Sequence, residues 1–213
     1  MKRFLLLLLI FGFSQKLAAQ GPGFWGGVGI EKKFNKQFSA GINTQFRFAD
    51  SFSFLQTNLI DAGTSYKLHK NFEVSANYRY ITRRKSELKN FKTRYRFYVD
   101  AAYSKKFKHI KFENRVRYQH QFQDNSGELA FDASYLRNKL EVSIPNKTKF
   151  TPYFSGDLFY RIGSVFDQIR PKIGIDFKLN KHNSIDAGVL SNISLINTET
   201  FIPIINIDYK FKF

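Results

Sequence analysis

The sequence of 213 residues contains no cysteine. This absence excludes a disulfide framework and anchoring through a lipid-modified cysteine. No helical hydrophobic period occurs after residue 20, no Gly-rich loop precedes a helix, and no spacing of His, Asp or Glu indicates a metal site. The sequence therefore supports neither a helical fold nor a metal centre, and we expect no cofactor.

Acidic residues are scarce relative to basic ones. Asp and Glu number 17 against 34 Lys and Arg, the formal net charge is +17, and there are 25 Phe and 11 Tyr. In a soluble protein such a balance would suggest binding to nucleic acid or to an anionic surface. Here the basic and aromatic residues lie on opposite faces of each predicted strand, whereas a base-stacking groove needs them side by side. We therefore expect no nucleic-acid partner.

The N-terminus has the layout of a secretory signal peptide. Two basic residues precede an apolar run over residues 4–13, and small residues follow. The run is about half as long as the roughly 20 residues that a spanning helix needs. We predict cleavage after Ala19 or Gln20, which gives a signal peptide (1–20) and one domain (21–213). A retained signal anchor is the alternative.

A two-residue alternation of apolar and polar side chains continues through the rest of the chain and predicts β-strands. Short polar turns alternate with longer connections, as in a series of hairpins. The predicted strands cover residues 24–34, 38–48, 54–68, 72–82, 91–106, 110–123, 135–144, 148–161, 166–179, 184–195 and 201–213.

The two faces of these strands differ in chemistry. Phe97 and Val99 belong to an uncharged face, and Arg94, Arg96 and Asp100 belong to the other. A soluble sandwich would need a second sheet over each aromatic face, whereas a transmembrane barrel exposes that face to lipid and pairs every backbone group by closure. We predict an all-β fold, an antiparallel up-and-down transmembrane β-barrel of about 10–12 strands. A soluble periplasmic basic β-protein is the alternative.

The chain ends on an apolar alternation with an aromatic last residue: Tyr209, Phe211 and Phe213. Such a final strand is the assembly signal of bacterial outer-membrane barrels. We therefore predict that the protein resides in the bacterial outer membrane as a monomer. Its expected partners are outer-membrane lipid and, during biogenesis, the barrel assembly machinery.

Several stretches resemble DUF2490, a domain family of uncharacterised Bacteroidetes outer-membrane proteins. The matching stretches are "FWGGVGIEKKFNKQFS" (24–39), "DAGTSYKLHKNFEVSANYRY" (61–80), "TRYRFYVDAAYSKKF" (93–107), "FENRVRYQ" (112–119), "YLRNKLEV" (135–142), "TPYFSGDLFY" (151–160) and "IDYKFKF" (207–213). Together they cover nearly the whole domain. The resemblance implies an outer-membrane barrel and implies no activity.

Nearly every predicted strand directs an acid inward, together with more numerous bases. Because long side chains can meet across a narrow barrel, and because a buried unpaired charge is costly, we predict a paired network that fills the lumen. This predicts a structural or narrow-transport role, and an anion-selective pore lined by the excess bases is the alternative. The predicted network comprises Glu31, Asp61, Glu73, Arg79, Arg94, Arg96, Asp100, Glu113, Arg115, Arg117, Arg137, Glu141, Asp157, Asp176 and Asp208, and Lys139, Arg170, Lys172 and Asp186 also point inward.

Catalysis has weaker support in the sequence. His120 lies on the predicted outward face between two aromatic residues, as a lipid hydrolase or acyltransferase acting at the outer rim would require. Such chemistry needs a nucleophile beside the base. Ser126 and Ser134 are near in sequence but are predicted to lie in a loop and belong to no elbow motif. We interpret His120 as part of an aromatic girdle and predict no enzymatic activity.

The strand count conflicts with the even number that is usual in bacterial barrels. Eleven predicted strands would start the barrel outside and end it in the periplasm. Either residues 24–34 lie only partly in the barrel, or a strand has been merged or missed, with 20–27 and 123–134 as candidates for hidden structure. Pro152, Pro171 and Pro203 also lie within predicted strands, although proline removes a ladder donor.

Overall fold

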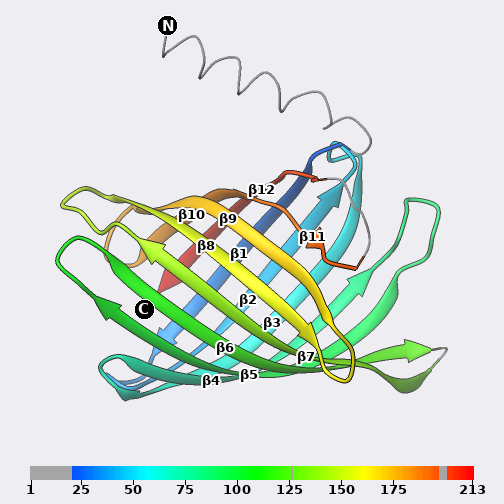
Figure 1. Ribbon diagram of the computed structural model, residues 1–213, viewed down its shortest axis with the longest axis horizontal. Helices are drawn as coiled ribbons and strands as arrows, with labels where there is room; N and C mark the ends of the chain where they lie inside the picture. Colours follow the sequence, from blue (N-terminus) through cyan, green and yellow to red (C-terminus); the bar gives the residue numbers. More distant parts are fainter. Residues whose placement is uncertain (1–20, 126, 197–200) are drawn as a thin grey trace, which may run out of the picture.

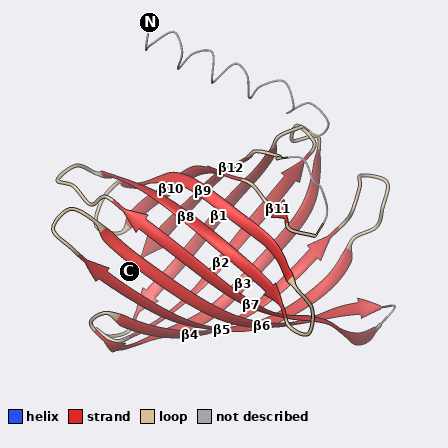
Figure 2. Cartoon of the chain, viewed as in Figure 1, coloured by secondary structure: helices blue, strands red, loops and turns tan. Residues whose placement is uncertain are grey.

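The computed structural model describes residues 21–125, 127–196 and 201–213. The predicted signal peptide and Ser126 lie outside these residues. Strands and their connections make up the described chain (Figure 2). Within these ranges, a search for a helix long and apolar enough to cross a membrane finds none.

The strands form one closed barrel, which Figure 1 shows from the side with strongly tilted strands. Strands β1 to β10 and β12 form its wall, and the two-residue β11 pairs only with β9. The strands are β1 (Gly23–Lys33), β2 (Phe38–Ala49), β3 (Phe54–His69), β4 (Phe72–Arg83), β5 (Lys92–Lys106), β6 (Lys111–Asn125), β7 (Glu128–Ser143), β8 (Phe150–Arg161), β9 (Phe166–Lys178), β10 (Asn183–Leu190), β11 (Ile193–Ser194) and β12 (Ile204–Lys212).

The barrel closes through a parallel pair, which explains its odd number of strands. β1 pairs with β12 from Gly23↔Ile204 to Glu31↔Lys212, and every other ladder is antiparallel. The first strand therefore lies wholly in the wall, and the expectation of a partial or missing strand is wrong. β1 and β12 both start at the end where β2–β3, β4–β5, β6–β7 and β8–β9 connect, called here the loop end. Both finish at the opposite end, called the turn end, where Phe213 also lies.

The segment 123–134, predicted as a connection and named as a candidate for hidden structure, belongs to a long hairpin. β6 and β7 remain paired as far as Asn125↔Glu128. A bulge beside Gln121 and Phe122 leaves Asp132 as an extra residue in β7, because Gln121 pairs with Ala133 and Phe122 with Phe131. The extra residue interrupts the two-residue period, which is why the alternation did not reveal this part of β7. Because β7 begins at Glu128, Ser134 lies in a strand and not in a loop.

Pro152 and Pro171 lie within the β8–β9 ladder, but each directs its backbone polar groups to its other neighbour, where pairing ends or is interrupted. Ile144 donates to the carbonyl of Pro152 just beyond the last β7–β8 pair, and Ser191 donates to the carbonyl of Pro171 in the break between β10 and β11. Pro203 precedes β12 and accepts a hydrogen bond from Gly23. At such positions the missing N–H of proline removes no interior ladder bond.

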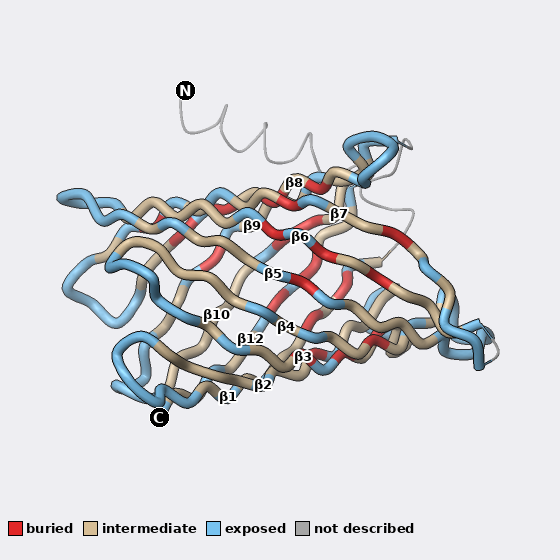
Figure 3. The backbone as a smooth tube through the Cα atoms, turned by 90° about the horizontal axis from the view of Figure 1, so that it is seen from below, coloured by how far each residue is buried: buried red, intermediate tan, exposed pale blue. Residues whose placement is uncertain are grey.

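Side chains alternate between an apolar outer face and a polar lumen, as predicted. Phe97 and Val99 are 53% and 52% exposed on the outside of β5, whereas Tyr98 between them is 5% exposed. Figure 3 shows buried positions alternating with exposed ones along the strands. Six buried apolar residues lie toward the loop end: Trp25, Leu59, Ile81, Phe159, Leu190 and Ile204. This set is called the loop-end plug.

Candidate functional site

The lumen contains a central charge network, and its first part is built around Tyr98. Asp61 of β3 pairs with Arg79 of β4, whose Nε donates at 2.7 Å. The hydroxyl of Tyr98 donates to the same carboxylate at 2.6 Å. The guanidinium carbon of Arg117 lies 3.7 Å from the centre of the Tyr98 ring. Side chains from four consecutive strands, β3 to β6, therefore meet at one point.

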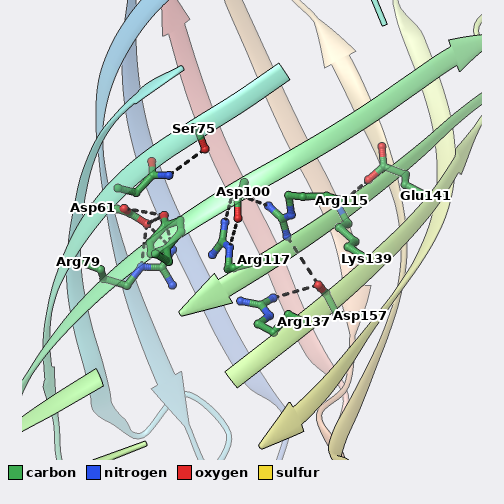
Figure 4. A network of polar contacts seen from close by, with 12 residues as sticks. Asp61, Ser75, Arg79, Asp100, Arg115, Arg117, Arg137, Lys139, Glu141 and Asp157 are labelled. Carbon is green, nitrogen blue, oxygen red and sulfur yellow. Dashed lines mark hydrogen bonds and ion pairs between the residues drawn. The ribbon is translucent and has the colours of Figure 1, made fainter. Parts of the chain in front are cut away.

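The second part of the network shares two carboxylates among three arginines (Figure 4). Arg117 binds Asp100 through two parallel bonds of 2.6 and 2.7 Å. Arg137 donates to Asp157 at 3.0 Å. Arg115 bridges the two acids, with its Nη atoms 4.0 Å from Asp100 and 3.6 Å from Asp157. The bidentate pairing of Arg117 with Asp100 fixes the geometry of both partners.

Smaller pairs surround this centre. Lys139 contacts Glu141 at 2.6 Å, and Lys111 contacts Glu113 at 3.0 Å. Arg94 lies 3.5 Å from Asp132. Two further groups complete the set: Lys172 with Asp186 and Tyr153, and, at the turn end, Lys212 with Glu31 at 3.1 Å.

Some predicted network residues have other partners. Asp208 accepts from Gln45 at 3.2 Å and from Asn206 at 2.9 Å, and Arg96 donates to Gln121. In the described part of the chain, Glu73, Asp176 and Asp208 form no ion pair within 4.0 Å. The structure thus gathers seven of the predicted residues into the central network, which are Asp61, Arg79, Asp100, Arg115, Arg117, Arg137 and Asp157. Glu31, Arg94, Glu113 and Glu141 lie in separate pairs.

Sequence reasoning missed the aromatic members of the lumen. Trp25 is stacked against Arg47, whose guanidinium carbon lies 3.7 Å from the ring centre, and Arg170 lies 5.1 Å from the same ring. Tyr153 donates to Asp186 at 2.6 Å. Their positions in the two-residue alternation could have revealed them, because they fall on the inward face between outward apolar residues.

The loop-end half carries cations that have amide partners. Arg47 donates to Gln45 at 2.8 Å, Arg96 to Gln121 at 2.9 Å and Arg170 to Asn192 at 2.6 Å. Their like charges repel one another across the lumen. Long inward side chains therefore meet across the barrel, as expected for a narrow interior.

The turn-end half is hollow. A cavity of about 920 Å³ extends from the turn end to Asp61 and Tyr98 and is lined by residues of β1 to β5 and β12. This cavity is called the vestibule. The lumen is therefore asymmetric, with an open chamber at the turn end, the charge network in the middle and the loop-end plug toward the other end.

His120 lies on the outer face, and its Nδ1 is 2.7 Å from the Oγ of Ser134 on β7. The imidazole ring stacks on Phe131 at 4.9 Å and meets Phe122 edge-on at 4.8 Å. This brings a potential base and a potential nucleophile together among aromatic side chains. The sequence did not predict this contact, because it placed Ser134 in a loop. In the structure, Ser134 lies in β7 directly opposite His120.

The predicted assembly signal lies on β12 beside the closing seam. Tyr209 and Phe211 are outward residues of β12, and the Phe211 and Phe213 rings are 5.6 Å apart. The backbone N–H of Phe213 donates to the carbonyl of Glu31 at 3.0 Å. The last residue is thus held against β1.

Comparisons with known proteins identify a family for the chain and no function. A family model described as "Protein of unknown function (DUF2490)" matches residues 22–200. A comparison with curated proteins found no match.

Proposed function

We propose, for a chain that belongs to the DUF2490 family of proteins of unknown function, that it is a bacterial outer-membrane barrel with a closed lumen. Its role is structural, or the transport of small solutes through a narrow path. In this proposal the protein is a monomer surrounded by lipid and has no enzymatic activity. The barrel assembly machinery inserts it into the membrane after the signal peptide is removed.

One observation carries the proposal: the barrel is inverted relative to a soluble fold. Large apolar side chains are exposed all around its outer surface, from Ile42 on β2 through Val99 on β5 to Ile173 on β9. Charged residues such as Arg117 and Arg137 are buried inside. Water would solvate this outer face poorly, whereas lipid matches it.

The two longest connections between wall strands, 84–91 and 191–203, both lie at the loop end and suggest an orientation. Outer-membrane barrels have short periplasmic turns and longer outer loops. The turn end would then face the periplasm, and the vestibule would open toward it. The loop-end plug would close the barrel toward the outside.

Cell fractionation of the expressed full-length chain tests the proposal. We expect the mature protein in the outer-membrane fraction, extracted only by detergent, with heat-dependent migration in gels. Release of the folded protein into the soluble periplasmic fraction would overturn the proposal and support the soluble β-protein instead.

A second candidate function rests on the contact between His120 and Ser134. In a lipid hydrolase, His120 would take the proton of the Ser134 hydroxyl while Oγ attacks an acyl ester carbonyl of a lipid. The lipid alcohol would leave with that proton, and water would release the fatty acid from the acyl-serine. Neighbouring Phe131 and Phe97 would contact the acyl chain.

Fatty-acid release from phospholipid vesicles separates the two candidates. We expect no turnover by the wild-type protein. Turnover that is lost in both Ser134→Ala and His120→Ala, with unchanged gel migration of the barrel, would establish the hydrolase and displace the non-enzymatic proposal.

A further inference from the structure

The vestibule exists because small residues occupy the inward positions of three neighbouring strands. Gly29 on β1, Ser39 and Gly41 on β2, and Gly63 and Ser65 on β3 line one wall. Toward the middle of the barrel, neighbouring inward positions carry larger side chains, such as Arg79 on β4 and Tyr98 on β5. The small residues of this wall therefore leave room for a chamber at the turn end.

The chamber has the dimensions of a ligand site. Its volume of about 920 Å³ falls within the range of roughly 300–1,000 Å³ that is typical of small-molecule pockets. Its floor is the Tyr98 hydroxyl and the Asp61 carboxylate that it binds. Both floor residues are buried. A solute that enters from the turn end therefore meets a closed floor.

The charges of the vestibule are predominantly positive. The lining includes five lysines, which are Lys33, Lys36, Lys67, Lys210 and Lys212, and three acids, which are Glu31, Asp61 and Glu73. Lys212 pairs with Glu31, and Arg79 pairs with Asp61. Four lysines and one carboxylate, Glu73, then remain without an ion pair among the residues that the structure describes. Glu73 lies directly opposite Lys67 in the β3–β4 ladder.

The surroundings add to this positive potential. Next to the floor, the guanidinium carbon of Arg117 lies 3.7 Å from the centre of the Tyr98 ring. Arg96 occupies the inward position before Tyr98 on β5. A concave site lined by charges of one sign between low-dielectric walls concentrates counter-ions. The vestibule is thus suited to attract small anions.

We propose that the vestibule binds a small phosphorylated solute that enters from the turn end. A phosphate monoester carries about two negative charges at pH 7 and three acceptor oxygens. Flexible lysines, each with three N–H donors, can surround such a group, while Ser39, Ser65 and Asn77 supply hydrogen bonds to its polar remainder. The inference rests on the proposed function only for the compartment from which the solute comes.

Isothermal titration calorimetry of the full chain in detergent tests the site, with glucose 6-phosphate as the probe and glucose as its uncharged counterpart. We expect binding of glucose 6-phosphate and none of glucose. Replacing Lys33, Lys67 and Lys210 together by Gln should weaken binding roughly tenfold, because three partly exposed charge contacts are lost. Gly29→Leu should weaken binding by narrowing the chamber, since a Cβ there meets no atom closer than 3.4 Å.

A matched control removes the same charge from the other end of the barrel. Replacing the exposed Lys85, Lys89 and Lys92 at the loop end by Gln should leave the affinity within about twofold, because charges beyond a Debye length are screened. No binding by the wild type, equal binding of glucose, or unchanged affinity in the vestibule triple variant or in Gly29→Leu would each overturn the inference. Cell fractionation tests the location of the protein independently of ligand binding. A failure of this inference can therefore be distinguished from a failure of the outer-membrane proposal.

Discussion

At the scale of single residues, Asp157 is a partner of two arginines at once, so that its loss would leave both without that carboxylate. Arg137 and Arg115 both contact its Oδ1, and Asp157 itself is buried. A buried charge without a partner is far more costly than the pair from which it came. The network therefore stabilises the barrel only while its few acids are all present.

Asp157→Ala should lower the free energy of unfolding by about 3–5 kcal/mol, the usual cost of breaking a buried ion pair from one side. Guanidinium unfolding of the barrel in detergent, followed by tryptophan fluorescence, measures this change. Glu31→Gln is the control, because its pair with Lys212 is partly exposed and contributes about 1 kcal/mol or less. Equal effects of the two variants would contradict a network that depends on buried acids.

The two faces of β5 give a second prediction at this scale. Val99→Arg places a charge on the outer face and should cost about 2–4 kcal/mol in a lipid environment. Ala102→Arg points into the lumen, where it lies opposite Glu73 of β4. It should cost less, because Glu73 lacks an ion pair among the described residues. Unfolding in lipid vesicles compares the two, and equal small costs would show that Val99 does not face lipid.

At the scale of elements, alternation predicted most of the wall and failed where the period breaks. The segments predicted for β2 to β5 end within one or two residues of the observed strands. The start of β7 was missed because Asp132 occupies a bulge, which shifts the phase of the alternation by one residue. The parallel seam could not be predicted, because alternation within a strand does not contain the direction of its neighbour. Gly27 is one trace of that seam, since a side chain there would overlap Asp208 of β12.

The final element gives a prediction about assembly. Deleting Phe213, or changing it to Asp, should reduce membrane insertion, because the terminal aromatic is lost from the predicted assembly signal. Protease protection and heat-dependent gel migration measure insertion. Phe107→Asp is the control. Phe107 lies in the β5–β6 connection at the turn end and is exposed to the same extent as Phe213, 50%. Normal insertion of both Phe213 variants would show that Tyr209, Phe211 and Phe213 are not the signal.

At the scale of the whole molecule, the sequence predicted a charged lumen but not its division into a vestibule and a plug. That division depends on which side chains meet across the barrel, and strands such as β2 and β9 are far apart in the chain. Arg47 and Arg170 both lie against Trp25 from these two strands, and neither the pairing nor the ring was evident from alternation. Closure at one end and a chamber at the other follow from the three-dimensional arrangement alone.

The most direct test of the closed lumen is the conductance of the purified protein in planar lipid bilayers at neutral pH. We expect no large, stable current, because the Asp100–Arg117 and Asp157–Arg137 pairs and the loop-end plug lie in the path through the barrel. A large, stable, anion-selective current would contradict a closed lumen. The lumen would then be open, and its surplus of arginine and lysine would select the ions that pass.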